Sequence, residues 1–252
     1  MIRLSVPYPR RLPIERSKPD NPRMTVIVGI PGQSVVLAAD QQLSIKEGHK
    51  FNEEKLFVID GLRWTVVLAY AGVPSIAKEI REKIEKRIFS LENTDEPLSF
   101  TDQIARDEVE SILLDVAQRH YELSLQMLVA ASIPPNSPVL WAFDQRAFRQ
   151  ADDLVYLGVG ESSISRYLKD HMYPTAFERE CGEGYDSEKN LDLALFLVER
   201  AKEYIDGCGG PTNAIVLEGD GKFSWLRPEE IQQRIDRMKQ KERLALRSIL
   251  LP

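Results

Sequence analysis

Three polar residues at the edges of apolar runs are the strongest chemical signal in this sequence. Thr25 opens one apolar run, Asp40 closes the next, and Lys55 opens a third. A threonine hydroxyl is a poor nucleophile unless a base lies beside it. The nearest base is the α-amino group of the threonine itself, whose ordinary pKa is about 7.7–8.0. The pattern therefore predicts nucleophilic chemistry at Thr25, on condition that Thr25 is the first residue of the mature chain.

The residues before Thr25 differ in composition from the rest of the chain. Prolines alternate with arginine and lysine over residues 1–23, and Met24 follows them. Proline fixes φ and has no N–H donor, so we expect residues 1–24 to form an extended or disordered tail. We interpret it as a propeptide, as an arm that binds a partner, or as a stretch that is not translated if Met24 starts the chain.

The overall composition restricts the class of protein. A chain of 252 residues with 43% hydrophobic content fits one globular domain of ordinary size. A net charge of −6 argues against nucleic acid as a partner. No window approaches the roughly 20 apolar residues of a membrane span, and no apolar segment marks a secretory signal. We therefore expect neither nucleic-acid binding nor a membrane partner.

Cysteine and histidine are too scattered to predict a metal centre or a disulfide framework. The two cysteines, Cys181 and Cys208, favour a reducing cytoplasm. The three histidines, His49, His120 and His171, lack metal-ligand spacing. The sequence thus predicts a cytoplasmic protein with no metal and no cofactor.

The order of the expected elements indicates layers rather than alternating β-α-β units. We expect strands at Thr25–Ile30, Val35–Ala39, Leu56–Ile59, Trp64–Tyr70, Leu125–Ser132, Val139–Asp144, Leu154–Leu157, Asn213–Leu217 and Phe223–Leu226. We expect helices over the Ile76–Ile88 repeat, Asp102 to about Gln126, about Ser162 to His171, Leu191–Ile205, and from Pro228 onward. This grouping predicts an α+β fold, a four-layer αββα sandwich over residues 25–226, followed by a charged helix over 227–252.

Four segments together make the sequence similar to a known family. Their order is Thr25–Ile30 as an opening strand, Leu37–Asp40 as an LAAD turn, Lys55–Asp60 as a KLFxID segment, and Ala71-Gly72 as an AG strand end. In this order the segments resemble the proteasome β-subunit family, the N-terminal-nucleophile threonine peptidases. The resemblance extends over roughly residues 25–226. It implies the αββα sandwich of that family and hydrolysis of peptide bonds.

The resemblance also implies a role for each residue around the nucleophile. The Oγ of Thr25 would attack the substrate carbonyl, and the free amine of Thr25 would take the hydroxyl proton. Lys55 would lie beside the nucleophile and pair with Asp40, because a buried ammonium needs a partner. The N–H of Gly72 would bind the oxyanion.

Further positions follow from the same resemblance. Ser44 lies where the family hydrogen-bonds the substrate backbone as an added strand. Leu43 and Tyr70 would line the pocket for the residue before the scissile bond. Asp206 stands where the family has another aspartate of the site.

Three departures from the family pattern bear on activity. Met24 stands where the family usually has glycine before the threonine. Translation from Met24, followed by trimming of that methionine, would replace self-cleavage. Val159 replaces the serine of a Gly-Ser-Gly motif. Cys208 replaces the serine of a later glycine motif, at a spacing from Asp206 that is one residue shorter.

These observations predict a threonine-type endopeptidase that acts on peptides or unfolded proteins. The resemblance implies a homo-oligomeric ring, with an ATP-dependent unfoldase as partner. One alternative is a catalytically inactive structural subunit, which Val159 and the altered segment at Asp206 favour. Another is an amidase with a small-molecule substrate, since this fold supports several chemistries.

Overall fold

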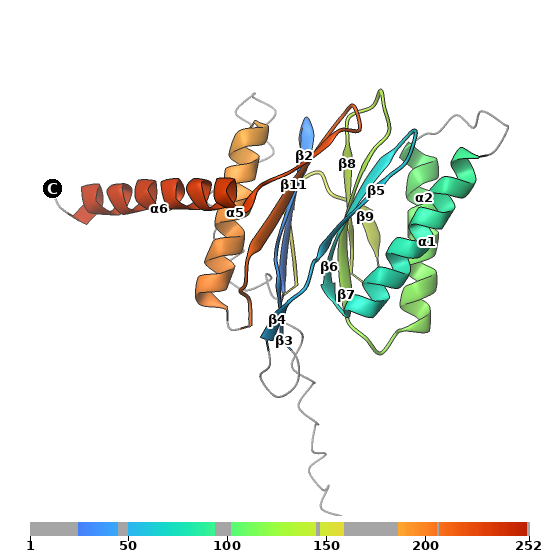
Figure 1. Ribbon diagram of the computed structural model, residues 1–252, viewed down its shortest axis with the longest axis horizontal. Helices are drawn as coiled ribbons and strands as arrows, with labels where there is room; N and C mark the ends of the chain where they lie inside the picture. Colours follow the sequence, from blue (N-terminus) through green and yellow to red (C-terminus); the bar gives the residue numbers. More distant parts are fainter. Residues whose placement is uncertain are drawn as a thin grey trace, which may run out of the picture.

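Two five-stranded antiparallel sheets lie face to face in this protein (Figure 1). The structure is a computed structural model, and it describes residues 25–44, 50–93, 102–144, 147–158, 186–205 and 207–250. The first sheet has the strand order β10-β1-β2-β11-β12. Its strands are β1 (Val26–Ile30), β2 (Ser34–Asp40), β10 (Val155–Gly158), β11 (Thr212–Glu218) and β12 (Phe223–Trp225).

The second sheet follows the order of the chain, β5-β6-β7-β8-β9. Its strands are β5 (Leu56–Asp60), β6 (Thr65–Gly72), β7 (Leu125–Ser132), β8 (Val139–Phe143) and β9 (Phe148–Gln150). A small hairpin of β3 (Gln42–Ser44) and β4 (Lys50–Asn52) leaves the end of β2 and leads toward β5.

Helices cover the outer face of each sheet (Figure 1). On the second sheet lie α1 (Pro74–Glu92) and α2 (Asp102–Arg119), and on the first sheet lies α5 (Ser187–Tyr204). The C-terminal helix α6 (Pro228–Leu250) packs against α5 at its N-terminal end and then projects away from the sandwich (Figure 1). The expected four-layer αββα sandwich is therefore confirmed.

Successive side chains of the central strands enter two different apolar layers, one beneath the helices and one between the sheets. In β2, Val36 and Ala38 point toward α5, whereas Val35, Leu37 and Ala39 point toward the second sheet. Both sets are buried, so the strand is a continuous apolar run rather than an alternating one. The predicted isoleucine repeat of α1 likewise forms one buried stripe, with Pro74 in the first turn.

Several element boundaries differ from the sequence prediction. The expected helix from Asp102 to about Gln126 was too long, because α2 ends at Arg119 and Gln126 pairs with Ala71 in the second sheet. The helix expected from Leu191 begins earlier, at Ser187, where Asp186 caps it by accepting the N–H of Lys189. Short strands β3, β4 and β9 were not predicted. The expected tail of residues 1–24 and the helix from Ser162 to His171 lie outside the described residues.

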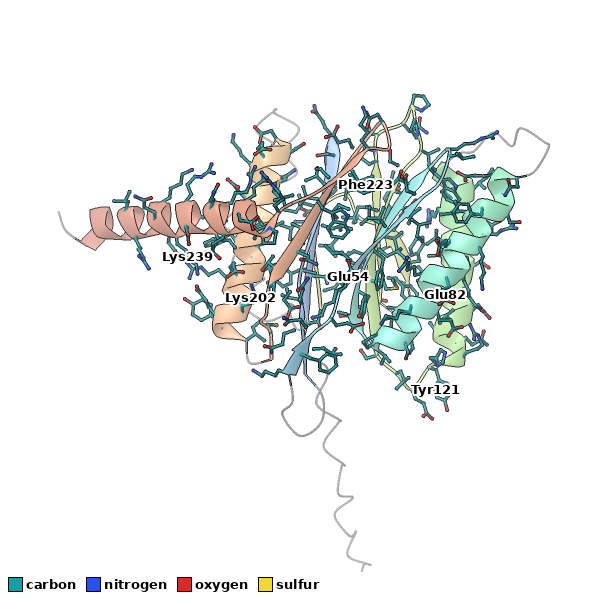
Figure 2. All side chains as sticks on the ribbon, viewed as in Figure 1. Glu54, Glu82, Tyr121, Lys202, Phe223 and Lys239 are labelled. Carbon is teal, nitrogen blue, oxygen red and sulfur yellow. The ribbon has the colours of Figure 1, made fainter. Side chains whose placement is uncertain are left out.

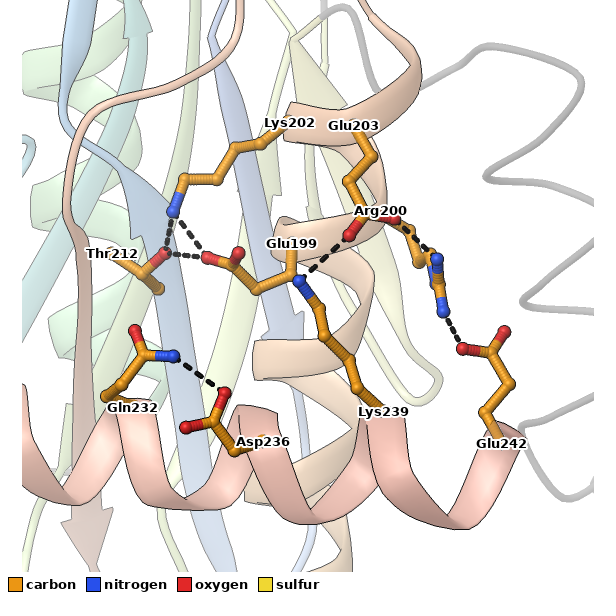
Figure 3. Close-up of polar contacts among 9 residues, drawn as sticks. All are labelled: Glu199, Arg200, Lys202, Glu203, Thr212, Gln232, Asp236, Lys239 and Glu242. Atoms are coloured by element: carbon orange, nitrogen blue, oxygen red, sulfur yellow. Dashed lines mark hydrogen bonds and ion pairs between the residues drawn. The ribbon is translucent and has the colours of Figure 1, made fainter. Parts of the chain in front are cut away.

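Charged side chains hold α6 across α5. Arg234 donates hydrogen bonds to Asp192 (2.8 Å) and Glu188 (2.6 Å) of α5. Farther along, Lys239 pairs with Glu203 at 2.8 Å, and Arg200 pairs with Glu242 (Figure 3). Ile231 and Ile235 add apolar contacts near the start of α6. Contacts between α6 and α5 therefore extend from the first turns of α6 as far as Glu242.

No helix within the described ranges is long and apolar enough to cross a lipid bilayer.

Candidate functional site

The residues expected to act together meet at one end of the sandwich. Asp40 is the last residue of β2, Gly72 the last of β6, and Gly158 the last of β10. Thr25 directly precedes β1, and Lys55 directly precedes β5. Because neighbouring strands are antiparallel, the start of one strand lies beside the end of the next. The sheet topology therefore brings together residues that are far apart in sequence.

Lys55 is the centre of this arrangement. Its Nζ lies 2.9 Å from Oγ1 of Thr25 and 2.9 Å from Oδ1 of Asp40. It also lies 2.6 Å from the backbone oxygen of Gln42. An ammonium has three N–H donors, and all three are used here. Lys55 thus donates a hydrogen bond to the Thr25 hydroxyl and is bound as a cation.

The Asp40 carboxylate likewise accepts several hydrogen bonds. Besides the Lys55 ammonium, it accepts the N–H of Val26 on Oδ1 at 2.9 Å and the N–H of Gly209 on Oδ2 at 3.0 Å. The Asp40 and Lys55 side chains are both 0% exposed. A buried ion pair needs such additional hydrogen bonds to offset desolvation, so these backbone donors stabilise the charged form of the pair.

Burial shifts the acid–base behaviour of the neighbouring groups. Desolvation lowers the pKa of Lys55, and the charge and hydrogen bond of Asp40 oppose that change. Burial raises the pKa of the Cys208 thiol to about 12, and the Asp40 carboxylate acts in the same direction. Cys208 is consequently a neutral thiol at physiological pH and a poor nucleophile.

Two glycines allow the strand ends to approach each other closely. Gly158 has φ +87°, and a Cβ there would lie 2.0 Å from the carbonyl oxygen of Thr25 and 3.3 Å from Cβ of Ala71. Gly72 has φ +132°, and a Cβ there would lie 2.3 Å from the carbonyl oxygen of Ser124. Only glycine fits at both positions. The backbone of Thr25 is thereby packed against the end of β6, where Gly72 follows Ala71.

The remaining predicted site residues are placed less completely. Leu43 is buried in β3, next to Gln42. Tyr70 is 1% exposed and stacks on Phe57 with ring centroids 5.7 Å apart, in the core between the second sheet and its helices. Ser44 lies in β3, and its side chain is outside the described part. Asp206 and Val159 also lie outside the described residues. The substrate-binding roles of Ser44, Leu43 and Tyr70 stay predictions, and so does the catalytic role of Asp206.

Three residues near the site were missed by sequence reasoning. Gln42 contributes both its carbonyl, to Lys55, and its side-chain amide, to the backbone oxygen of Gly207. Gly209 donates to Asp40. Gln126 accepts the N–H of Gly158 at 2.7 Å and so joins the second sheet to the first beside Thr25. Of the three, only Gly209 belongs to a predicted feature, the later glycine motif that contains Cys208.

Two hollows of about 400 and 440 Å³ lie at the opposite end of the sandwich. One lies between the β5–β6 and β11–β12 turns, and the other lies between the start of α5 and β12. In Figure 2, Tyr121, just before β7, marks the end of the sandwich that carries the candidate site. Phe223, in β12, lines the first hollow near the other end. Neither hollow contains a residue of the candidate site. Within the described ranges, no cluster of three histidine, cysteine or carboxylate side chains is arranged to hold a metal ion.

The two sheets and their covering helices define the fold class of this structure. It has the fold of the N-terminal-nucleophile hydrolases in its proteasome-like form. No family model matches the sequence, and no curated protein matches it. The likeness is therefore one of structure.

Solved structures of Anbu proteins are among those that match. Anbu (ancestral β-subunit) from Yersinia bercovieri superposes with a TM-score of 0.71 at 16% identity, covering 90% of this chain and 98% of that chain. A Gly-1 mutant of Anbu from Hyphomicrobium sp. strain MC1 gives 0.68 at 14% identity, with 88% and 96% covered. The helical assembly of the Anbu complex from Pseudomonas aeruginosa gives 0.65 at 17% identity, with 90% and 97% covered. At these identities the likeness establishes the fold.

Proposed function

We propose that this protein is a threonine-type peptidase whose nucleophile is the hydroxyl of Thr25. The observation that carries the proposal is the 2.9 Å hydrogen bond from Nζ of Lys55 to Oγ1 of Thr25, in a lysine already paired with the buried Asp40. A cation at this position stabilises negative charge that develops on Oγ1. A threonine in an ordinary strand needs no such neighbour.

The proton of the Thr25 hydroxyl needs an acceptor other than Lys55. All three donors of the Lys55 ammonium are engaged, so Lys55 has no lone pair to offer. Hydrolysis of the peptide bond between Met24 and Thr25 converts the amide nitrogen of Thr25 into an amine. The lone pair of that amine can accept the hydroxyl proton. The proposal therefore includes removal of residues 1–24, or translation from Met24 followed by loss of the methionine.

The reaction then proceeds in two halves. Oγ1 of Thr25 attacks the substrate carbonyl carbon, its proton passes to the amine, and the carbonyl π electrons move to the oxygen. The N–H of Gly72 stabilises that oxyanion. As the carbon–nitrogen bond breaks, the ammonium of Thr25 returns the proton to the leaving amine. Water, deprotonated by the same amine, then hydrolyses the ester and restores the threonine hydroxyl.

The substrate in this proposal is a peptide or an unfolded protein in the cytoplasm. Ser44 binds the substrate backbone, and Leu43 and Tyr70 form the pocket for the residue before the scissile bond. Tyr70 is bulky and stacked on Phe57, which favours small side chains in that pocket. Asp206 is proposed to support the site from the segment after α5.

Assembly into a homo-oligomer is part of the same proposal. The solved structure from Pseudomonas aeruginosa is described as a helical assembly of the Anbu complex, and the shared fold supports a homo-oligomer, ring or helical, for this chain. An ATP-dependent unfoldase would deliver folded substrates to it. Mass measurement of the native assembly by light scattering tests this: a monomer at micromolar concentration would refute it.

A structural subunit without activity is the second candidate. Cys208 supports it, because a neutral thiol of raised pKa stands where the family has a serine. Labelling by a threonine-directed electrophile, read by intact mass, separates the two functions. A chain beginning at Thr25 should gain one adduct, and Thr25→Ala should gain none, whereas Thr25→Ser should retain labelling because it keeps hydroxyl and amine. A chain beginning at Thr25 that gains no adduct would refute the peptidase.

Cleavage assays on two substrate types define the substrate class. An unfolded protein and a set of small-molecule amides are compared with the wild type and Thr25→Ala. Hydrolysis of the protein alone, with loss of at least about a thousandfold in kcat in Thr25→Ala, is expected. Hydrolysis of the small amides alone would assign the site to an amidase.

A further inference from the structure

The side chain of Gln42 closes a ring of hydrogen bonds around the candidate site. Nε2 of Gln42 donates to the backbone oxygen of Gly207 at 2.8 Å, and its backbone oxygen accepts from Nζ of Lys55 at 2.6 Å. Gly209 donates to Oδ2 of Asp40, whose Oδ1 accepts from Lys55. The ring thus runs from Lys55 through Gln42 and the glycine segment to Asp40 and back to Lys55.

A second backbone contact holds the same two segments together. The N–H of Gln42 donates to the backbone oxygen of Gly209 at 3.0 Å. A Cβ on Gly209 would lie 2.6 Å from Oε1 of Gln42, so the segment lies directly against the Gln42 amide. Gln42 is 9% exposed. A buried amide that satisfies a backbone carbonyl in this way is costly to replace by an apolar group.

We propose that Gln42 is a positioning residue of the peptidase: its side chain ties the Gly207–Gly210 segment to β3 and so fixes the carbonyl that holds the Lys55 ammonium against Thr25. The inference rests on the proposed function for its catalytic meaning, but the ring itself is independent of activity. Gln42 does not contact the reacting atoms. It acts through Lys55 on one side and through Gly209 and Asp40 on the other.

The neighbouring residue offers a matched control. Gln41 is the same residue type, one position earlier, and its side chain forms no hydrogen bond with the described part of the chain. The backbone N–H of Gln41 donates to the backbone oxygen of Pro211, and its backbone oxygen accepts the N–H of Glu53. A side-chain substitution leaves both hydrogen bonds in place. Gln42→Met and Gln41→Met therefore change the same number of atoms beside the same backbone. Only the first removes a member of the ring.

The first measurement is hydrogen exchange in the full chain, read by mass spectrometry on peptides that cover residues 207–212. Loss of one hydrogen bond should raise exchange of the amides in this segment about tenfold in Gln42→Met. Gln41→Met should exchange as the wild type does. Unchanged protection in Gln42→Met would overturn the proposal, whether or not the protein is a peptidase.

The second measurement is the pH dependence of kcat in the chain that begins at Thr25. In Gln42→Met we expect kcat to fall about tenfold with KM near its wild-type value, because the substrate does not touch Gln42. The alkaline limb of the kcat profile should move to lower pH, since an ammonium with a poorly placed acceptor loses its proton earlier. A lower kcat with an unmoved profile would reduce Gln42 to a structural role.

A third variant disturbs the ring from its other side. Gly209→Ala places a methyl group against Oε1 of Gln42 and should reproduce the exchange and kcat changes of Gln42→Met. In Gln42→Ala the space for that methyl exists, so adding Gly209→Ala should cost little more. Strictly additive effects in this double-mutant cycle would contradict the contact. If the wild type hydrolyses nothing, the proposed function fails, while the exchange measurements still decide the ring.

Discussion

Nζ of Lys55 lies 2.9 Å from Oγ1 of Thr25, and it reaches that position from the start of a strand in the other sheet. The contact spans the space between the two sheets at one end of the sandwich. The same Nζ donates to Asp40, which ends the strand beside β1. The candidate nucleophile and its cation therefore keep their geometry only while the two sheets keep their relative position.

Removal of the Lys55 charge should destabilise the protein as well as inactivate it. Lys55→Met leaves the fully buried Asp40 carboxylate without a counterion, which typically costs about 3–5 kcal/mol. Adding Asp40→Asn removes the unpaired charge and should recover part of that loss, without any recovery of hydrolysis. Urea unfolding of both variants and the wild type measures this.

The control for that experiment is an exposed ion pair. Lys222 pairs with Asp220 on the surface, so Lys222→Ala should leave the urea midpoint unchanged. Equal destabilisation by Lys55→Met and Lys222→Ala would show that burial of the first pair has no energetic consequence.

Substitution of Gly158 should strain the backbone at the site. Gly158→Ala requires a Cβ 2.0 Å from the Thr25 carbonyl oxygen at φ +87°, so the strand end must move. Such strain costs on the order of 1–3 kcal/mol, and Thr25 should shift with it, lowering kcat. Gly219→Ala is the matched control, because its nearest neighbouring atom lies 3.5 Å from the added Cβ. Thermal unfolding that does not distinguish the two variants would contradict this close approach.

The Cys208 thiol should make stability decrease at alkaline pH. Its pKa rises from 9.0 to about 12 on folding, chiefly through burial. Between these values the unfolded chain releases the thiol proton while the folded chain keeps it, so the free energy of unfolding falls as pH rises. Other groups titrate in this range, and Cys208→Ala isolates the thiol: its stability curve should decline less steeply. Identical slopes would mean that the thiol ionises as readily folded as unfolded.

Reactivity of the same thiol provides an independent check. At neutral pH, a thiol reagent should modify Cys208 in the urea-unfolded chain and leave it unmodified in the folded chain, because the reactive thiolate is absent there. Peptide mass mapping reads the site of modification. Rapid modification of Cys208 in the folded protein would refute this.

Arg234 should hold the N-terminal half of α6 on α5. Its side chain is 12% exposed, and its guanidinium donates to Glu188 and Asp192 of α5. Arg234→Met should destabilise this docking by about 1–2 kcal/mol and raise hydrogen exchange in α6. The control is Arg237→Met, three residues on, whose side chain is exposed and forms no ion pair with the described residues. Equal exchange in both variants would exclude Arg234 as the anchor.

Much of the fold could be predicted from local pattern. The apolar runs of β1, β2, β5 and β6 are buried on both faces, and a continuous run shows this without knowledge of the partner strand. The short strands β3, β4 and β9 could not be predicted in this way. Each has only three residues, too few for a period to appear, and each exists because a neighbouring strand supplies its hydrogen bonds.

The boundary between α2 and β7 illustrates the same limit. The helical pattern predicted continuation to about Gln126, yet the backbone of Gln126 pairs with Ala71 across the sheet and its side chain bonds Gly158. Both partners are far away in the sequence. Tertiary contacts therefore override the local helical preference at the residues beside the site.

The sequence by itself determined which residue types stand at the ends of the apolar strands: Thr25, Asp40, Lys55 and Gly72. Residue type and strand period are local properties, so they are readable without a fold. Only the tertiary structure decided that Gln42 and Gly209 join this group. Gln42 bonds Gly207, 165 residues away in the sequence, and Gly209 bonds Asp40, 169 residues away. Such contacts depend on strand register and on how closely glycine backbones approach, and neither leaves a pattern in a single stretch of sequence.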